Sequence, residues 1–131
     1  MKRKKEQIQQ SKPIRLFTDG AGQRPDGNGS GFAWFREDTG EKHVERVPGL
    51  SNNDAEYRGI ISALKTVTKG SQTEVLSDSL LVVSQLRGEY RIRDPKLEKL
   101  AAEVKTVTQQ RHLVLKVTWI PRQQNRAGKL L

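Results

Sequence analysis

The sequence predicts an α/β fold: a mixed five-stranded sheet, made of a three-strand antiparallel meander plus parallel strands, with helices on both faces. Three strand-like stretches follow one another before residue 48, which predicts the meander. From residue 51 onward, helical periodicity alternates with further short strand-like stretches. At 131 residues the chain suits one compact domain with a core of its own.

The first three elements are expected to be strands. "IRLFTDGAG" is apolar from Ile14 and ends in a glycine-rich turn, and residues 29–38 and 39–47 follow as a second and a third strand. A turn at Asp38-Thr39-Gly40 joins the last two. Short connections between successive strands favour an antiparallel meander.

A helix is expected over "SNNDAEYRGIISALKTVTKG", because its apolar residues recur at helical spacing. These residues are Tyr57, Ile60, Ile61, Leu64 and Val67. Asn52 or Asn53 can cap the start of this helix, and Gly70 can end it.

The rest of the chain alternates between strands and helices. The expected elements are a strand at "TEVLSDS", a short helix at "LLVVSQLRG", a longer helix over residues 95–110, a strand over residues 113–121 and a final helical start. Parallel strands joined by helical crossovers place reactive groups at their carboxyl ends, so a site is expected there.

Charge and cysteine content restrict the class of protein. The formal net charge of +9 fits either a polyanionic partner or a well-solvated basic surface. The chain has no cysteine and no long apolar run, so we expect no disulfide, no membrane span and a cytoplasmic location. Residues 1–13 are expected to form a basic, flexible tail, and residues 14–131 a single domain.

Two predicted strands end in an aspartate, Asp19 in "LFTDG" and Asp78 in "VLSDS", and Glu56 lies in the first turn of the helix between them. Each acid has a structural alternative: Asp19 as a turn residue, Asp78 as a helix cap, and Glu56 as an acid at a helix N-terminus. Together, however, they are expected to converge on one edge of the sheet. Buried carboxylates are costly when unpaired, so a cation, hydrogen-bond donors or a metal are expected beside them.

Four segments, in this order, resemble type 1 ribonuclease H: "LFTDGAG", "NNDAEYRGIISAL", "VLSDSLLVVSQLRGEY" and "VTWIPRQQNRA". "LRGEYRIRDPKL" passes directly from one helix to the next, which resembles the compact branch without the basic protrusion. The resemblance implies a ribonuclease H-like fold and a divalent-metal-dependent endoribonuclease that hydrolyses the RNA strand of RNA–DNA hybrids, leaving 5′-phosphate and 3′-hydroxyl ends. It also implies two Mg²⁺ or Mn²⁺ ions per site, held by Asp19, Glu56 and Asp78.

The same resemblance implies that the substrate is recognised by its backbone rather than by its bases. The positions that match the family's substrate contacts are Gly20, Ala21, Ser51, Asn52, Asn53 and Arg122. The expected partner is an RNA–DNA hybrid, with double-stranded RNA left open, and the chain is expected to be a monomer without an obligate protein partner. Tyr57 and Trp119 are expected to lie in the core rather than to stack on a substrate.

The family's last segment ends in an acid that this chain lacks. Counting without a gap puts Lys129 at its position, and a one-residue deletion puts Gly128 there. Asn125 offers the nearest oxygen ligand, so one hypothesis is an Asp-Glu-Asp-Asn site with Asn125 as the fourth catalytic and metal-binding residue; Asn125 also suits a role in shaping the loop. The missing acid leaves an alternative function, a catalytically silent hybrid- or double-stranded-RNA-binding module of the same fold.

Overall fold

The computed structural model describes residues 12–26 and 29–131, and over these residues it confirms the predicted α/β class. The elements are β1 (Ile14–Ala21), β2 (Gly31–Arg36), β3 (Lys42–Arg46), α2 (Asn52–Leu64), β4 (Gln72–Ser77), α3 (Leu80–Leu86), α4 (Pro95–Gln110), β5 (Val114–Trp119) and two 3-10 turns, η1 (Arg122–Gln124) and η2 (Gly128–Leu130). Most of the expected tail, residues 1–11, lies outside the described residues. In the described part of the chain, no helix is long and apolar enough to cross a membrane.

The five strands form one mixed sheet in the order β3-β2-β1-β4-β5, which combines the meander with parallel strands as predicted. β1 pairs antiparallel with β2, and β2 with β3. On its other side β1 runs parallel to β4, and β4 runs parallel to β5. The last partners in the β1–β4 register are Thr18 and Ser77, so the next residues, Asp19 within β1 and Asp78 just after β4, come beside each other.

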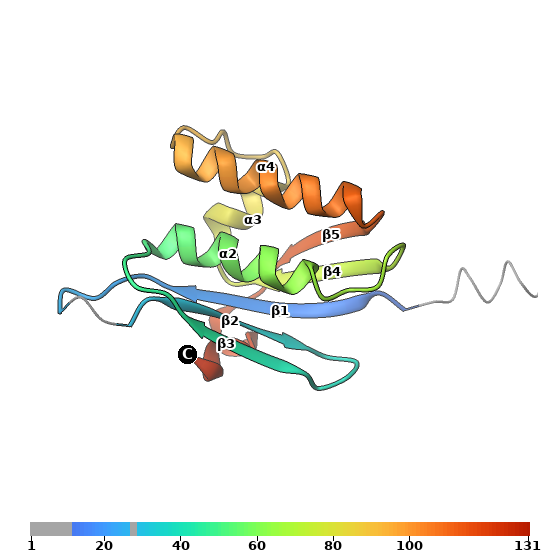
Figure 1. The fold of residues 1–131 in the computed structure, drawn as a ribbon, viewed down its shortest axis with the longest axis horizontal. Coiled ribbons are helices and arrows are strands. Elements are labelled where there is room, and N and C mark those ends of the chain that lie inside the picture. Colours follow the sequence, from blue (N-terminus) through green and yellow to red (C-terminus); the bar gives the residue numbers. More distant parts are fainter. Residues whose placement is uncertain (1–11, 27–28) are drawn as a thin grey trace, which may run out of the picture.

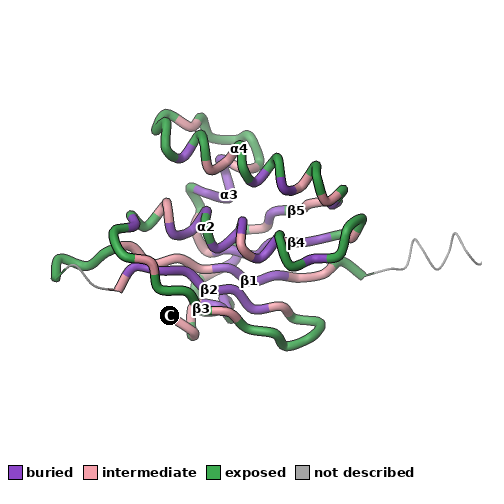
Figure 2. Tube along the Cα trace, viewed as in Figure 1, coloured by how far each residue is buried: buried purple, intermediate pink, exposed green. Residues whose placement is uncertain are grey.

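Side chains alternate between the two faces of the sheet, and each face has its own apolar core. Leu16 and Val75 belong to the larger core, together with buried residues of α2, α3 and α4. Phe17 and Leu76, one residue further along the same strands, belong to a smaller core that includes Ala127. In Figure 2, β1 and β4 are buried or half-buried over most of their length, whereas the edge strand β3 is largely exposed.

The second face of the sheet differs from the prediction. Figure 1 shows α2, α3 and α4 on one face and the C-terminal turns on the other. In place of the expected helix, residues 121–131 form the short turns η1 and η2. Asn125, between them, has an extended backbone (φ −82°, ψ 103°) and is 1% exposed, because its side chain is hydrogen-bonded into the sheet. This anchored residue interrupts the helical run, so the second face carries short turns instead of a regular α-helix.

The ends of α2 also differ from those expected. Ser51, rather than Asn52 or Asn53, caps its start, because the Ser51 Oγ accepts a hydrogen bond from the backbone N–H three residues later at 3.1 Å. The helix ends at Leu64 instead of Gly70, since the following backbone hydrogen bonds tighten to three-residue spacing.

Two aromatic residues that were expected in the core have different surroundings. Tyr57 is fully buried, as predicted, and its hydroxyl donates a hydrogen bond to Gln85 Oε1 at 2.8 Å. The prediction for Trp119 is wrong: it ends the edge strand β5 and is 45% exposed. Its Nε1 donates a hydrogen bond to the backbone oxygen of Asp78 at 3.2 Å, so the exposed ring stands beside the predicted site.

Candidate active site

The three acids singled out in the sequence converge at the carboxyl end of the central strands. The β1–β4 register brings Asp19 and Asp78 together, and α2 adds Glu56. One carboxylate oxygen from each of the three lies within 4.8 Å of the others. Carboxylate oxygens gathered in this way can hold a divalent cation such as Mg²⁺.

α2 carries Glu56 to this cluster by packing directly on the backbone of β1. A Cβ atom on Gly20 would lie 2.3 Å from backbone atoms of Ala55 and Glu56, and one on Gly59 would lie 3.2 Å from the backbone oxygen of Asp19. A side chain at residue 20 would therefore displace α2 and move Glu56 away from the aspartates. Gly20 therefore has a packing role, and its contact with a substrate remains a prediction.

Burial and mutual repulsion change the acidity of the cluster. Burial, followed by the charges of Asp19 and Asp78, raises the pKa of Glu56 to about 9. Burial and the charge of Asp78 raise the pKa of Asp19 to about 6, while the Gly20 backbone N–H and Arg122 act in the opposite direction. Glu56 therefore retains its proton near neutral pH unless positive charge is supplied.

One oxygen atom of the cluster has no hydrogen-bond partner. Glu56 is 7% exposed, and its Oε1 is buried without a donor. An unpartnered buried carboxylate oxygen is costly, so it calls for a cation or a donor. A divalent cation fits this donor set, because it would neutralise the repulsion between the acids and give Oε1 a partner.

Asn125 reaches the cluster, but its amide oxygen faces elsewhere. Its Nδ2 donates to the backbone oxygen of Thr18 at 2.9 Å and to Oδ2 of Asp78 at 3.3 Å, while its Oδ1 accepts from the backbone N–H of Ala127 at 3.1 Å. The backbone partners fix this orientation, since a carbonyl oxygen only accepts and an N–H only donates. The geometry favours Asn125 as a donor that orients Asp78, and it does not favour the hypothesis of a fourth metal ligand.

Gly128, the first residue of the turn η2, lies against Asp19. A Cβ atom on Gly128 would lie 3.3 Å from Oδ2 of Asp19, so a short side chain at this position would enter the site. Lys129, the other counterpart of the missing acid, is exposed. Among the described residues, the group able to hold a metal thus consists of three acids, with a glycine beside them.

The polar residues at the start of α2 have separate structural roles. Ser51 caps the helix, and Oδ1 of Asn52 accepts a hydrogen bond from the backbone N–H of Gly22 at 2.6 Å, which ties the chain after β1 to the helix. Asn53 is half-buried in the first turn. Their contacts with a substrate remain predictions.

Arginine side chains from three separate segments lie near Ala21 and Asp19. Ala21 lines an open cleft together with Arg24 and Arg46, and Arg122 is exposed and close enough to Asp19 to favour its ionised form. The sequence did not single out Arg24 and Arg46, because they come from a loop and from the end of β3 and no local pattern links them.

The chain is similar in sequence and in fold to known proteins. The model of the reverse transcriptase-like family matches residues 17–131. The bifunctional protein Rv2228c of Mycobacterium tuberculosis is 39% identical over 83 residues, which are 62% of this chain and 22% of that protein, so the chain spans only a minor part of this relative.

Two solved structures share the fold over nearly their whole length. RNase H1 from the halophilic archaeon Halobacterium salinarum is 25% identical, with a TM-score of 0.78 and coverage of 92% of this chain and 94% of that one. LC11-RNase H1, isolated from compost by a metagenomic approach and solved in complex with an RNA/DNA hybrid, is 29% identical, with a TM-score of 0.76 and coverage of 89% and 92%.

The compact form expected from the sequence is also present. Residues 87–94, which connect α3 and α4, form neither helix nor strand, so no additional helical protrusion lies between these helices. The family model covers most of the chain, and the RNase H1 structures share its topology. The chain therefore belongs to the reverse transcriptase-like family, in its compact type 1 ribonuclease H group.

Proposed function

We propose that this domain is an endonuclease that hydrolyses the RNA strand of RNA–DNA hybrids and leaves 5′-phosphate and 3′-hydroxyl ends. The observation that carries the proposal is the convergence of three carboxylates within 4.8 Å at the carboxyl end of parallel strands, one of them with a buried oxygen that lacks a partner. The relative solved in complex with an RNA/DNA hybrid supports the choice of substrate.

Asp19, Glu56 and Asp78 are the proposed metal ligands. When bound, two divalent cations, Mg²⁺ or Mn²⁺, supply Lewis-acid chemistry that activates the attacking water and stabilises the leaving 3′-oxygen. The buried Glu56 and the half-buried aspartates keep the ligand oxygens in place, because β1, β4 and α2 fix their backbones.

Other residues of the chain act on the substrate or on these ligands. Asn125 holds Asp78 by donating to its Oδ2. The proposed phosphate contacts are Arg122 and the two arginines of the cleft that Ala21 lines, Arg24 and Arg46. The net charge of +9 adds attraction for the polyanion as a whole.

The alternative function is a catalytically silent module that binds hybrids or double-stranded RNA. One observation favours it, because Gly128 stands beside Asp19 where a further acid would complete the cluster. Three acids beside a phosphate backbone argue against a pure binder, since they repel the substrate unless cations neutralise them. Cleavage is therefore the function that the site supports best.

A strand-labelled hybrid tests the proposal. The RNA strand and, in a parallel sample, the DNA strand are end-labelled, and the protein is added in Mg²⁺, in Mn²⁺ or in EDTA. We expect internal cuts in the RNA strand only, in the presence of either cation, and none with Asp78→Asn. Intact RNA in both cations, with the hybrid still retarded on a gel, would support the silent module. Cleavage of a double-stranded RNA of the same sequence at an equal rate would show that the substrate is not specifically a hybrid.

A further inference from the structure

Residues 121–131, which we call the C-terminal segment, are attached to the rest of the fold mainly by side chains. The last backbone hydrogen bond between β5 and the sheet runs from the N–H of Ile120 to the oxygen of Ser77 at 2.9 Å. Beyond it, the backbone hydrogen bonds of the described segment have both partners inside the segment. Side-chain contacts must therefore fix the position of the segment.

The segment touches two acids of the cluster from one side. Asn125 donates to Asp78, and Gly128 lies against the carboxylate of Asp19. Small movements of the segment would thus change the surroundings of both acids.

Arg126, in the same stretch, contacts the second face of the sheet. Its Cζ atom lies 4.1 Å from the centre of the Phe35 ring and 5.9 Å from the centre of the Phe17 ring, and its Nη1 lies 3.9 Å from Oε2 of Glu37. A guanidinium over an aromatic face and beside a carboxylate is attracted by both. Arg126 therefore joins the segment to β1 and to the end of β2.

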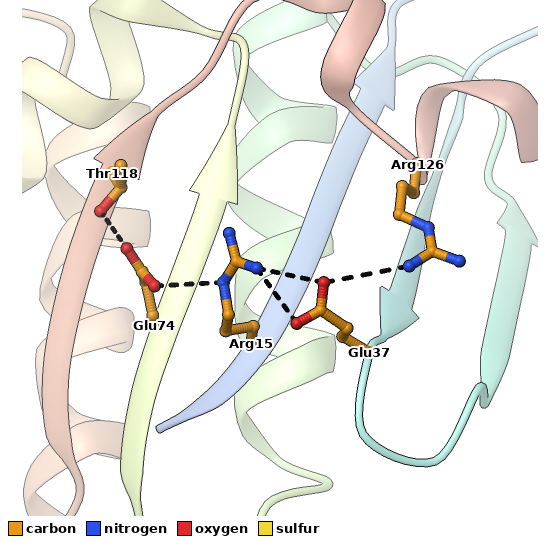
Figure 3. Close-up of polar contacts among 5 residues, drawn as sticks. All are labelled: Arg15, Glu37, Glu74, Thr118 and Arg126. Carbon is orange, nitrogen blue, oxygen red and sulfur yellow. Dashed lines mark hydrogen bonds and ion pairs between the residues drawn. The ribbon is translucent and has the colours of Figure 1, made fainter. Parts of the chain in front are cut away.

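The carboxylate that Arg126 meets is already held by other side chains. Figure 3 shows a continuous row of contacts from Thr118 through Glu74 and Arg15 to Glu37 and Arg126. Arg15 Nη1 lies 3.1 Å from both oxygens of Glu37, its Nε lies 3.4 Å from Oε1 of Glu74, and Thr118 donates to Oε2 of Glu74 at 2.7 Å. Because Arg15 orients Glu37, pairing with Arg126 requires little further ordering.

We propose that Arg126 is a positioning residue of the active site: seated on Phe35 and Glu37, it keeps Asn125 on Asp78 and Gly128 on Asp19, and so sets the cation affinity of the cluster. The inference rests on the proposed function only in taking the three acids as the cation site. Arg126 itself touches neither cation nor substrate in this role. Loosening it lets the segment move away, and Asp78 loses the donor that orients it.

Calorimetric titration of the substrate-free protein with Mg²⁺ tests this role. We expect Arg126→Ala to raise the dissociation constant for Mg²⁺ roughly fivefold, the weight of one exposed ion pair plus one cation–π contact. Two milder variants are expected to cause smaller increases. Arg126→Lys keeps the charge but loses the planar group, and Glu37→Gln keeps the sequence of the segment but removes the charge that Arg126 meets.

Arg36→Ala is the matched control, because it removes an arginine–carboxylate pair, to Asp38 at 2.7 Å, from the neighbouring hairpin without touching the segment. Thermal unfolding in EDTA is measured for every variant. We expect Arg36→Ala to lower the Tm and leave Mg²⁺ affinity unchanged.

Two outcomes would overturn the proposal. One is a lower Tm with unchanged Mg²⁺ affinity in both Arg126→Ala and Glu37→Gln, and the other is an equal loss of Mg²⁺ affinity in Arg36→Ala. If the wild type binds Mg²⁺ but leaves hybrids intact, the proposed function fails, whereas the pattern of affinities still supports or refutes the role of Arg126.

Discussion

Two regions meet at the active site, and they are held there in different ways. Asp19 lies near the end of β1, and Asp78 directly follows β4. A parallel ladder fixes the backbones of these two strands, and Gly20 allows α2 to pack directly on β1. The C-terminal segment, by contrast, depends on single side chains such as Asn125 and Arg126. We infer that the acids at the strand ends provide the chemistry and that the C-terminal segment adjusts their affinity for cations.

Asp19→Asn tests the strand ends and should have the largest effect. We expect cleavage of the hybrid to fall by more than roughly 100-fold, beyond the 10- to 100-fold losses typical of residues that only orient a metal ligand. The Tm in EDTA near neutral pH should rise, because the change removes a buried charge whose pKa is raised to about 6. A loss of cleavage with a gain in Tm would identify Asp19 as a metal ligand. A loss of both would instead indicate a structural residue.

Asn125→Asp separates an amide donor from a metal ligand. An aspartate cannot donate to Asp78 or to the backbone oxygen of Thr18, so we expect Mg²⁺ affinity to fall by roughly 10- to 100-fold. The free energy of unfolding should fall by about 1–3 kcal/mol, the cost of leaving buried groups unpaired. Asn125→Ala is expected to weaken Mg²⁺ binding as well. Tighter Mg²⁺ binding by Asn125→Asp, measured by calorimetry, would restore the fourth-ligand hypothesis.

Gly128→Asp adds a carboxylate from the segment to the cluster. A Cβ atom there would lie 3.3 Å from Oδ2 of Asp19, so we expect a several-fold gain in Mg²⁺ affinity. The Tm in EDTA should fall, because a further acid joins a cluster whose members already repel one another. Gly128→Asn, of the same size without charge, controls for crowding. Equal Mg²⁺ affinity in Gly128→Asp and Gly128→Asn would show that the added charge does not reach the cation site.

The raised pKa values predict that the stability of the protein depends on pH. Between their ordinary values and their folded values of about 6 for Asp19 and about 9 for Glu56, the native protein keeps protons that the unfolded chain has lost. In EDTA the free energy of unfolding should therefore decrease as pH rises from about 4 to about 9. Mg²⁺ should stabilise the protein more at high pH, since it binds the ionised acids. Thermal unfolding of wild type and Glu56→Gln checks this; an identical pH slope in both would contradict the assignment for Glu56.

The sequence predicts the strand-end half of the site well, because β ladders obey a local pattern. Apolar runs that end in Asp19 and Asp78, with a helix between them, are enough to predict that these acids lie close together. The same local pattern misplaced the cap of α2 at Asn52 or Asn53, since three adjacent polar residues can each serve and only the backbone geometry selects Ser51.

The segment could not be predicted in the same way. The orientation of the Asn125 amide depends on Thr18 and Asp78, which are remote in sequence, and Arg126 finds its partners on β1 and near the end of β2. Trp119 was placed in the core because it is aromatic, but whether it is covered depends on the position of β5 at the edge of the sheet. Such contacts follow from the assembled fold and have no local signature.

Anomalous diffraction from crystals soaked in Mn²⁺ would locate the cations that the three acids are proposed to hold. We expect manganese bound by the carboxylates of Asp19, Glu56 and Asp78, with Glu56 Oε1 among the ligands and the amide oxygen of Asn125 still on the Ala127 N–H. Manganese coordinated by Asn125 Oδ1, or absent from the three acids under conditions in which the protein cleaves hybrids, would contradict this expectation.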